Sequence, residues 1–264
     1  MSYDLKLTAL VEPTHFWFQG FRAYVMPVIR EIVEGRRDLR MIDCGCGTGY
    51  NLRPLLQPYG QACTFDMSPD ALQRARASGL PLACADMEHI PFHSGSFDLV
   101  TSFDVVHSVT DDRKALREMA RVLKPGGVFA FNTSFYEGSH PPESEQFYRR
   151  WLMRALRILR SKYGLSPQKS EKVESRRHLS PEEYTQLLEG IGFNVKKRRI
   201  QTVQVPLEGW VTISQFEDWI KGVMPGVPLK EASDSLTDAA AEVFDDLKVN
   251  FIPRNWLHII AARP

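Results

Sequence analysis

The sequence predicts a doubly wound α/β protein, with a mainly parallel sheet of seven strands and helical segments inserted as caps. In the first half of the chain, short apolar runs alternate with amphipathic segments. Such alternation implies parallel strands joined by right-handed crossovers, with helices on both faces of the sheet. A glycine-rich turn follows the first run, and the alternation ends after Thr133, where Ser, Pro, Gly and Glu become frequent. We therefore expect a regular core and a cap-forming second half.

The expected strands are short runs of aliphatic, β-branched and aromatic residues. Five lie in the first half, where each is followed by a loop and usually a helix, and two lie further along the chain. They span residues 39–44, 61–66, 80–85, 97–102, 127–133, 193–200 and 256–262.

Capping signals and helical spacing predict the helices. Pro69 follows Ser68, and a proline fits the first turn of a helix. Ser180 begins a similar start signal with glutamates behind it, and Asp111 with Asp112 starts another helix. The longer helices follow from apolar residues that recur at helical spacing. We expect helices over residues 69–78, 111–123, 146–163 and 180–190, and two more within 207–250.

Length and rhythm suggest one large domain with insertions. A chain of 264 residues fits one large domain or one domain with a cap. We expect six segments: a helical leader (1–34), the core with the glycine-rich turn (35–133), a cap insertion (134–180), a continuation of the core (181–205), a second cap insertion (206–250) and a terminal core strand (251–264).

Composition excludes several classes of protein. With 43% hydrophobic and 25% charged residues, the chain has the composition of a folded globular protein. Its formal net charge of +1 gives no global basic field, so we expect no nucleic-acid partner. No apolar run reaches the roughly 18 residues of a membrane span, and the first residues contain no long apolar region. We therefore expect a cytoplasmic protein without a transmembrane segment.

The cysteines indicate reduced core thiols rather than a metal site. All four, Cys44, Cys46, Cys63 and Cys84, fall in the first third of the chain, and three lie in or beside expected strands. Cys44 and Cys46 are spaced like half a metal site, but no second Cys or His pair with zinc-like spacing follows. We expect no metal.

Charge is segregated in the second half. Residues 149–178 carry ten Lys or Arg and two Glu, a net charge of +8, whereas residues 207–250 carry nine Asp or Glu and three Lys, a net charge of −6. The two segments could face each other as solvated basic and acidic surfaces. Alternatively, the basic segment recognises an anionic substrate or a membrane surface.

The most informative motif runs from Met41 to Leu52. An expected strand ends in an acidic residue, and a glycine-rich turn then opens a helix, where a ligand can approach backbone amides closely. A dinucleotide fingerprint that starts at Gly45 would need a third glycine where Tyr50 stands. The pattern from Asp43 to Gly49 is instead Asp-x-Gly-x-Gly-x-Gly. It resembles the first motif of class I S-adenosylmethionine-dependent methyltransferases.

Further matches follow at the spacing of a methyltransferase type 11-like domain. The second expected strand ends in Asp66, and the third leads into Ala85-Asp86-Met87-Glu88-His89-Ile90-Pro91-Phe92. Ser96 to Val100 and Ser102 to His107 match around the fourth strand, and Arg121 to Gly127 before the fifth. The resemblance covers residues 39–133 and is specific because the matches occur in this order. It implies the Rossmann-like methyltransferase fold.

The resemblance implies a set of cofactor-binding residues. The acidic residue after the second strand takes the ribose hydroxyls, and Met67 covers the adenine face. The acidic residue of the third motif meets the adenine amino group. Glu12 to Gly20 looks like the aromatic leader that folds over the cofactor in relatives, although a plain amphipathic helix is an alternative. The expected S-adenosyl-L-methionine site comprises Trp17, Asp43, Gly45, Cys46, Gly47, Asp66, Met67, Asp86, Met87 and Phe103.

Two positions in the leader depart from the relatives. Relatives in this family often carry arginine at the positions of Gln19 and Phe21. In this chain, neither position supplies an arginine to the methionine carboxylate of the cofactor. Arg22 is the available replacement.

Methyl transfer from a sulfonium needs orientation and exclusion of water more than covalent chemistry. A general base is needed only if the acceptor must lose a proton, and His107 after the fourth strand is the candidate base. Alternatively, His107 is a hydrogen-bonded helix-start or loop residue, and Asp104 and Asp111 either orient it or cap a helix. An acceptor pocket could be lined by His107, Phe135, Tyr136, Tyr148 and Trp151. The alternative for the four aromatic residues is that they are buried in the core.

The resemblance therefore implies a methyltransferase that acts on an oxygen, nitrogen or carbon atom of a small or medium-sized molecule by in-line displacement. The alternative is a protein of the same fold that binds S-adenosylmethionine and has a non-methylating activity, such as cyclisation or decarboxylation, or a regulatory role. A nicotinamide-dependent oxidoreductase is a third possibility, which Tyr50 weakens.

Overall fold

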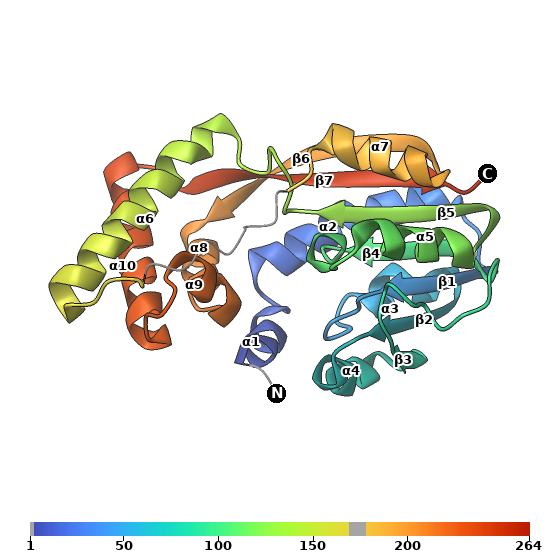
Figure 1. Cartoon of the computed structure of the whole chain (residues 1–264), viewed down its shortest axis with the longest axis horizontal. Coiled ribbons are helices and arrows are strands. Elements are labelled where there is room, and N and C mark those ends of the chain that lie inside the picture. Colours follow the sequence, from blue (N-terminus) through green and yellow to red (C-terminus); the bar gives the residue numbers. More distant parts are fainter. Residues whose placement is uncertain (1–2, 169–177) are drawn as a thin grey trace. The chain divides into compact units, whose positions relative to one another are not determined.

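The structure is a computed structural model that describes residues 3–168 and 178–264. In this part of the chain, seven strands form one sheet (Figure 1). The strands are β1 (Leu39–Cys44), β2 (Gly60–Asp66), β3 (Leu82–Cys84), β4 (Phe97–Phe103), β5 (Leu123–Thr133), β6 (Asn194–Pro206) and β7 (Phe251–Ala262). The α-helices are α1 (Tyr3–Val11), α2 (Phe16–Val33), α3 (Leu52–Leu55), α4 (Pro69–Ala75), α5 (Asp112–Val122), α6 (Pro142–Tyr163), α7 (Pro181–Ile191), α8 (Leu207–Ile213), α9 (Glu217–Val223) and α10 (Leu229–Leu247). Single 3₁₀ turns span Gln57–Tyr59 (η1), Arg76–Ser78 (η2) and Val106–Ser108 (η3).

The strand order is β3-β2-β1-β4-β5-β7-β6. Strands β1 to β5 pair in parallel with their neighbours, whereas β7 runs antiparallel to β5. The predicted doubly wound, mainly parallel sheet of seven strands is therefore confirmed. The chain moves outward from β1 in one direction through β2 and β3, and in the other through β4 and β5. Strand order thus reverses between β1 and β4, which is where open α/β sheets bind ligands.

Several element bounds differ from the predicted ones. Strand β3 is shorter than residues 80–85, because the chain enters it through Pro81, which has no amide hydrogen to donate. Strands β6 and β7 are longer than predicted, and α6 already begins at Pro142, where a proline fits the first turn. Residues 207–250 form three helices rather than two. The turn between α8 and α9 contains neither glycine nor proline, so the sequence gives no break signal there.

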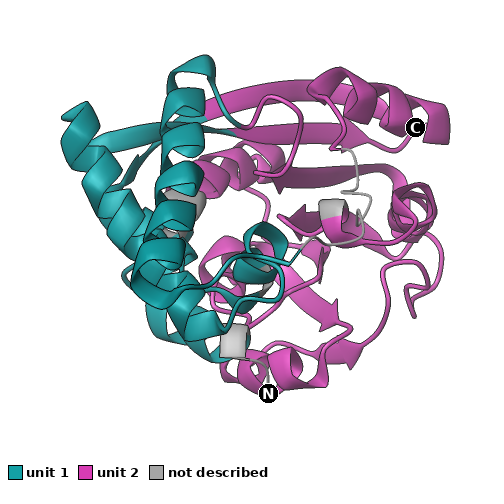
Figure 2. Cartoon of the chain, turned by 60° about the vertical axis from the view of Figure 1, so that its left-hand side comes forward, with its two compact units in different colours: residues 1–18, 140–177, 202–255 teal, residues 19–139, 178–201, 256–264 magenta. Residues whose placement is uncertain are grey.

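The chain divides into two compact units, which Figure 2 colours separately. Unit 1 comprises residues 1–18, 140–177 and 202–255. Unit 2 comprises residues 19–139, 178–201 and 256–264, and strands β6 and β7 contribute residues to both units. The six segments expected from the sequence stay a proposal about how the chain is organised.

The core of unit 2 packs helices on both faces of the sheet. Helices α5 and α7 cover one face, where Leu116 and Leu188 join a cluster with Phe129 and Phe131. Both helices begin at the predicted caps: Asp111 accepts a hydrogen bond from the amide of Lys114, and Ser180 forms a capping box. On the opposite face, the ring of Tyr24 in α2 meets His258 of β7 edge-on at 5.6 Å.

The core of unit 1 is aromatic. Trp151 of α6 stacks on Phe147 at 5.5 Å and meets Trp210 edge-on at 5.3 Å. Its indole nitrogen donates to the carbonyl oxygen of Leu236 in α10 at 2.8 Å, so the one polar atom of a fully buried side chain is satisfied. Helix α6 therefore packs along α10 through its apolar face (Figure 1).

Charged residues of α6 and α10 pair outside this core. Arg154 lies 2.5 Å from Glu242 and 2.6 Å from Asp246, and Lys162 lies 2.9 Å from Asp238. At these residues the basic and acidic segments face each other, one of the arrangements that the sequence left open. Exposed ion pairs of this kind contribute little to stability, so the apolar contacts dominate the packing of the two helices.

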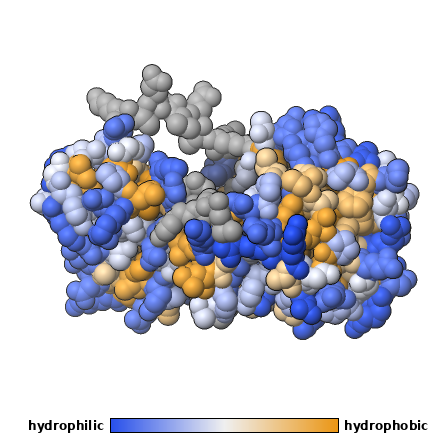
Figure 3. Space-filling model, turned by 90° about the horizontal axis from the view of Figure 1, so that it is seen from below, coloured by the Kyte–Doolittle hydropathy of each residue, from blue (hydrophilic) through white to orange (hydrophobic). Residues whose placement is uncertain are grey.

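Apolar side chains also reach the surface. The face drawn in Figure 3 shows hydrophobic residues between hydrophilic ones. Among the described residues, Leu10, Met67 and Met153 are the most exposed large hydrophobic side chains. No helix in the described part of the chain is long and apolar enough to cross a membrane.

Candidate functional site

The carboxyl ends of the parallel strands bring the predicted motif residues to one edge of the sheet. Cys44 ends β1, Asp66 ends β2 and Phe103 ends β4, and β1 pairs with both other strands. The glycine-rich turn follows β1 directly. It therefore lies at the reversal of strand order that is suited to ligand binding.

Two glycines of the turn are required by packing within unit 2. Gly45 has φ +84°, and a Cβ placed there would lie 2.5 Å from Cε of Met87. Gly49 has φ +75°, and its Cβ would lie 2.9 Å from Cα of Ala75 in α4. Both positions combine a left-handed backbone with a close neighbour, a combination that only glycine tolerates. The Gly45 amide also donates to the carbonyl oxygen of Phe65 at 3.0 Å, which ties the turn to β2.

Gly47 differs from these two glycines. Its φ is +52°, but an added Cβ would meet nothing within 4 Å, so the backbone faces open space. Its amide donates to Oδ2 of Asp66 at 2.8 Å. The turn therefore presents an accessible stretch of backbone beside a carboxylate, as the motif predicts.

Asp66 is held in place by backbone amides. Oδ2 accepts from Gly47, and Oδ1 accepts from the amide of Ser68 at 2.9 Å. A carboxylate can accept about four hydrogen bonds, so it retains capacity for the two hydroxyls of a ribose. Met67 follows and is 74% exposed, free to cover an aromatic ring.

Asp43 lies beneath the turn. Its side chain is buried and accepts a hydrogen bond from Oγ1 of Thr101 in β4 at 2.7 Å. Burial raises its pKa to about 7; the Thr101 hydrogen bond acts against this rise and the nearby charge of Asp66 adds to it. Asp43 thus connects β1 to β4 and supports the turn, and it does not face solvent.

The third motif supplies one exposed and one buried residue. Asp86 is exposed, and its Oδ1 accepts from the amide of Glu88 at 2.9 Å. Met87 is buried and packs against Gly45 from within the core. Because Ala85 donates its amide to the carbonyl of Asp66, this segment lies next to the end of β2. Asp86 is therefore exposed beside the end of β2, whereas Met87 shapes the turn from inside.

Asp104 is a functional candidate whose contacts the sequence did not predict. It has φ +58°, a strained conformation for a residue other than glycine, and it directly follows β4. Its carboxylate accepts from the amide of Ser134 at 2.8 Å and from the Ser134 hydroxyl at 3.0 and 2.9 Å. Its own amide donates to Oδ1 of Asn132 at 3.1 Å. Asp104 thus joins the ends of β4 and β5.

Two of the predicted site residues have side chains that lie outside the described part of the structure. Trp17 belongs to α2, and His107 belongs to the 3₁₀ turn after β4. The position of His107 three residues after Asp104 keeps it near the carboxyl end of β4. Its role as a base stays a prediction.

Arg22 lies at the glycine-rich turn. Its Nη2 donates to the hydroxyl of Tyr50 at 3.1 Å, and its guanidinium carbon lies 4.5 Å from the centre of the Tyr50 ring. This cation–π contact holds the charge beside the turn, while most of its donors stay available for an anion. Tyr50, which breaks the dinucleotide fingerprint, thus serves as a support for an arginine.

The aromatic residues predicted for an acceptor pocket are divided between the units. Phe135 and Tyr136 belong to unit 2, where Phe135 is partly exposed and Tyr136 is buried in the core. Tyr148 and Trp151 belong to unit 1, and Trp151 is fully buried. Burial raises the pKa of Tyr148 to about 12, so its hydroxyl stays protonated. Trp151 fits its alternative interpretation as a core residue.

The cysteines are free thiols, as expected. Cys44 is buried, but Cys84 is exposed, so the expectation of core thiols is wrong for Cys84. Burial raises the pKa of Cys46 to about 12, which leaves a neutral thiol next to Gly47 and makes it a poor nucleophile. No three His, Cys, Asp or Glu side chains within the described residues group as metal ligands.

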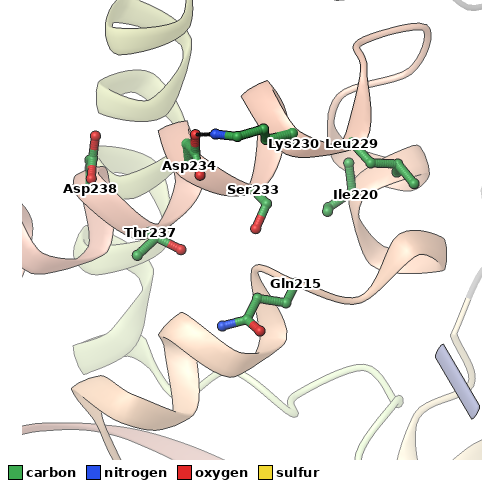
Figure 4. A pocket seen from close by; sticks show the side chains of 8 residues that line it. All are labelled: Gln215, Ile220, Leu229, Lys230, Ser233, Asp234, Thr237 and Asp238. Carbon is green, nitrogen blue, oxygen red and sulfur yellow. Dashed lines mark hydrogen bonds and ion pairs between the residues drawn. The ribbon is translucent and has the colours of Figure 1, made fainter. Parts of the chain in front are cut away.

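Unit 1 contains a cavity of about 500 Å³ between α10 and the α8–α9 region (Figure 4). In Figure 4, Gln215 lies opposite Ser233 and Thr237 of α10. Lys230 forms an ion pair with Asp234 at 2.6 Å beside them. The cavity is lined by Gln215, Ile220, Leu229, Lys230, Ser233, Asp234, Thr237 and Asp238. None of them is a predicted site residue.

Comparison with known proteins agrees with the fold and the motif. A family model described as "Methyltransferase domain" matches residues 42–131. A demethylmenaquinone methyltransferase from Corynebacterium urealyticum is 33% identical over 154 residues, which cover 58% of this chain and 59% of that protein. One from Mycolicibacterium vanbaalenii is 30% identical over 62% of this chain and 68% of the relative. The chain spans only about half the length of several curated relatives, with 59%, 56% and 48% of the relative covered in three cases.

Solved structures share the fold at low sequence identity. A candidate methyltransferase from Bacillus halodurans superposes with a TM-score of 0.60 at 17% identity, over 90% of this chain and 98% of that one. The cyclase SpnF superposes with a TM-score of 0.56 at 15% identity, over 91% of this chain and 81% of that one. The chain belongs to the class I S-adenosylmethionine-dependent methyltransferases.

Proposed function

We propose that the chain binds S-adenosylmethionine at the glycine-rich turn and transfers its methyl group to an oxygen, nitrogen or carbon atom of a small or medium-sized molecule. The observation that carries this proposal is the arrangement of Gly47 and Asp66. The glycine leaves its backbone open to a ligand, and its amide fixes the carboxylate that would take the ribose hydroxyls. The family of the chain supports the same cofactor.

The residues of unit 2 fit this cofactor in several places. Asp66 would bind the ribose, Met67 and Asp86 the adenine, and Arg22 the methionine carboxylate through a charge-assisted hydrogen bond. When bound, the cofactor would supply an activated methyl group on a sulfonium for in-line transfer to an acceptor atom, with the thioether S-adenosylhomocysteine as the leaving group. The chain's own residues would bind and orient the cofactor and the acceptor and would exclude water, because in-line methyl transfer depends mainly on alignment.

The ends of β4 and β5 would position the acceptor. Asp104 holds the two strand ends together through Ser134, and His107 follows on the same loop. His107 would take a proton only from an acceptor that must lose one. Asp43 is buried and hydrogen-bonded to Thr101, so we assign it a supporting role beneath the turn.

Release of S-adenosylhomocysteine distinguishes this proposal from its alternative. The purified chain is incubated with labelled S-adenosylmethionine and a panel of small acceptors, and both products are quantified. Methyl transfer yields one S-adenosylhomocysteine for each methylated product. Conversion of an acceptor without S-adenosylhomocysteine would instead support a non-methylating enzyme, a use of this fold that the name of SpnF exemplifies.

The small formal net charge favours a small acceptor over a nucleic acid. The two relatives named above are called demethylmenaquinone methyltransferases, and demethylmenaquinone is a small molecule. We propose a cytoplasmic enzyme with a small-molecule acceptor.

A further inference from the structure

The outer face of α6 has a composition unlike that of an ordinary solvent-exposed helix. Residues of α6 alternate between the apolar core of unit 1 and the surface with helical periodicity. On the outward side, residues at spacings of three and four lie next to one another. This outer face of α6 consists of Arg149, Arg150, Met153, Leu156, Arg157 and Arg160, all of them exposed.

The arginines of this face have no acidic partner in the described part of the chain. Arg154 and Lys162 of the same helix pair with α10, but Arg149, Arg150, Arg157 and Arg160 form no ion pair there. The acidic residues of α6 are confined to its first turn. The acidic face of α10 therefore neutralises one side of α6 and leaves the opposite side with four positive charges.

Two large apolar side chains lie between these arginines. Met153 is 61% exposed and Leu156 is 39% exposed. Arg149 and Arg160 mark the ends of the face, and at 1.5 Å per residue they lie about 16 Å apart along the helix. An isolated exposed apolar residue needs no explanation, but an apolar pair enclosed by unpaired arginines forms an amphipathic surface.

We propose that the outer face of α6 docks on an anionic lipid surface, with the helix axis parallel to the membrane plane. Anionic headgroups attract the arginines, whose long side chains reach the headgroups while their carbon chains cover the apolar residues. Met153 and Leu156 enter the boundary of the acyl chains. Charge complementarity alone would also suit a nucleic acid, but phosphates give the two apolar side chains no partner. This surface goes beyond methyl transfer and does not depend on it.

Vesicle binding tests the proposal with the full chain. The chain is mixed with phosphatidylcholine vesicles that contain about 30% phosphatidylserine, or with vesicles of pure phosphatidylcholine. Bound protein is measured by flotation. We expect binding to the anionic vesicles only, and a decrease as salt is raised from about 50 to about 500 mM. Absence of binding to anionic vesicles at low salt would overturn the proposal.

A matched pair of double variants locates the surface. Arg157→Gln with Arg160→Gln removes two charges from the face, and we expect a partition coefficient roughly 30-fold lower, since each arginine near an anionic surface is worth about fivefold. Arg113→Gln with Arg117→Gln removes two exposed arginines from α5 in unit 2 and should leave vesicle binding unchanged. Equal losses in both double variants would contradict a specific role of α6.

A third variant separates lipid from other polyanions. Met153→Gln with Leu156→Gln keeps the charge and the helix propensity, but we expect it to lose the vesicle binding that remains at high salt. Titration with a duplex RNA runs in parallel. Tight RNA binding that the apolar substitutions leave unchanged, together with no vesicle binding, would replace the lipid proposal by a nucleic-acid surface. Methyl transfer is not measured in these assays, so their outcome is independent of the proposed function.

Discussion

The two units of the chain differ in where their polar residues concentrate. In unit 2, Asp43 and Asn132 are buried at strand ends, and Asp104 has a strained backbone in the same region. In unit 1, the core around Trp151 is mainly apolar and aromatic, and charged side chains such as Arg154 and Glu242 pair at its surface; the buried charged residues Glu12 and Arg254 are exceptions. Buried polar groups and backbone strain cost stability and persist where a site needs them. The comparison therefore supports the proposed ligand site in unit 2 and a mainly packing role for the core around Trp151.

Among these tests, Trp151→Ala should have the largest effect on stability. The change removes a fully buried indole together with the hydrogen bond that it donates to the carbonyl of Leu236. We expect a loss of about 3–5 kcal/mol in the free energy of unfolding. If unit 1 contributes packing only, the dissociation constant for S-adenosylmethionine should not change, as calorimetric titration would show. Should the alanine variant not fold, Trp151→Phe allows the same comparison.

Gly47→Val tests the opposite region. A branched side chain would occupy the open space in front of the turn, so we expect cofactor binding to weaken at least about 100-fold. Gly95→Val is the matched control, because Gly95 also has a positive φ, +67°, and open space around it, but precedes β4 at the other edge of the sheet. Both variants should lose about 1–2 kcal/mol of stability through backbone strain. Only the first should lose binding; similar titration curves for the two variants would be contrary to the account.

Asp66→Asn removes the charge of the carboxylate and keeps its shape. Charge-assisted hydrogen bonds contribute roughly 1.5–3 kcal/mol, so we expect cofactor affinity to fall about 10- to 150-fold. An unchanged dissociation constant would exclude Asp66 from the site. The thermal unfolding midpoint serves as the control, because the amides of Gly47 and Ser68 also depend on this side chain.

Asp43 gives unit 2 a distinctive dependence of stability on pH. Because its pKa is raised to about 7 in the folded state, the folded chain keeps a proton that the unfolded chain loses above pH 4. Its contribution to stability therefore falls as the pH rises from about 4 to about 7, with a slope of at most about 1.4 kcal/mol per pH unit. In Asp43→Asn this contribution is absent, so denaturant unfolding should show the variant gaining stability relative to the wild type across that window.

His258 contributes the opposite slope. Burial lowers its pKa to about 4, so its contribution to stability is lost as the pH falls from about 6.5 towards 4. The two slopes partly cancel in the wild type. The difference between Asp43→Asn and the wild type isolates the carboxyl group, and a difference that does not vary with pH would contradict a raised pKa for Asp43.

Local patterns in the sequence predicted the parts of the site that depend on neighbouring residues. The glycines from Gly45 to Gly49, together with Asp66, occupy the expected turn and strand end because tight turns and strand ends have their own residue preferences. The caps at Asp111 and Ser180 are likewise where the sequence puts them. These features need no knowledge of distant contacts.

Features that depend on distant contacts were not predictable. The bonds from Ser134 to Asp104 join residues 30 positions apart, and the left-handed backbone at Asp104 has no sequence signal. Burial of Trp151 depends on the packing of α6 against α10, so helical spacing alone left its core and pocket interpretations open. The pairing of Arg22 with Tyr50 likewise needs the tertiary fold.

Calorimetric titration of the purified chain with S-adenosylmethionine, with S-adenosylhomocysteine and NAD in parallel, tests the central claim most directly. The account predicts dissociation constants on the order of micromolar for the two sulfur compounds and no heat of binding with NAD. Binding of NAD, or no response to either sulfur compound, would contradict a methyl-donor site at the glycine-rich turn.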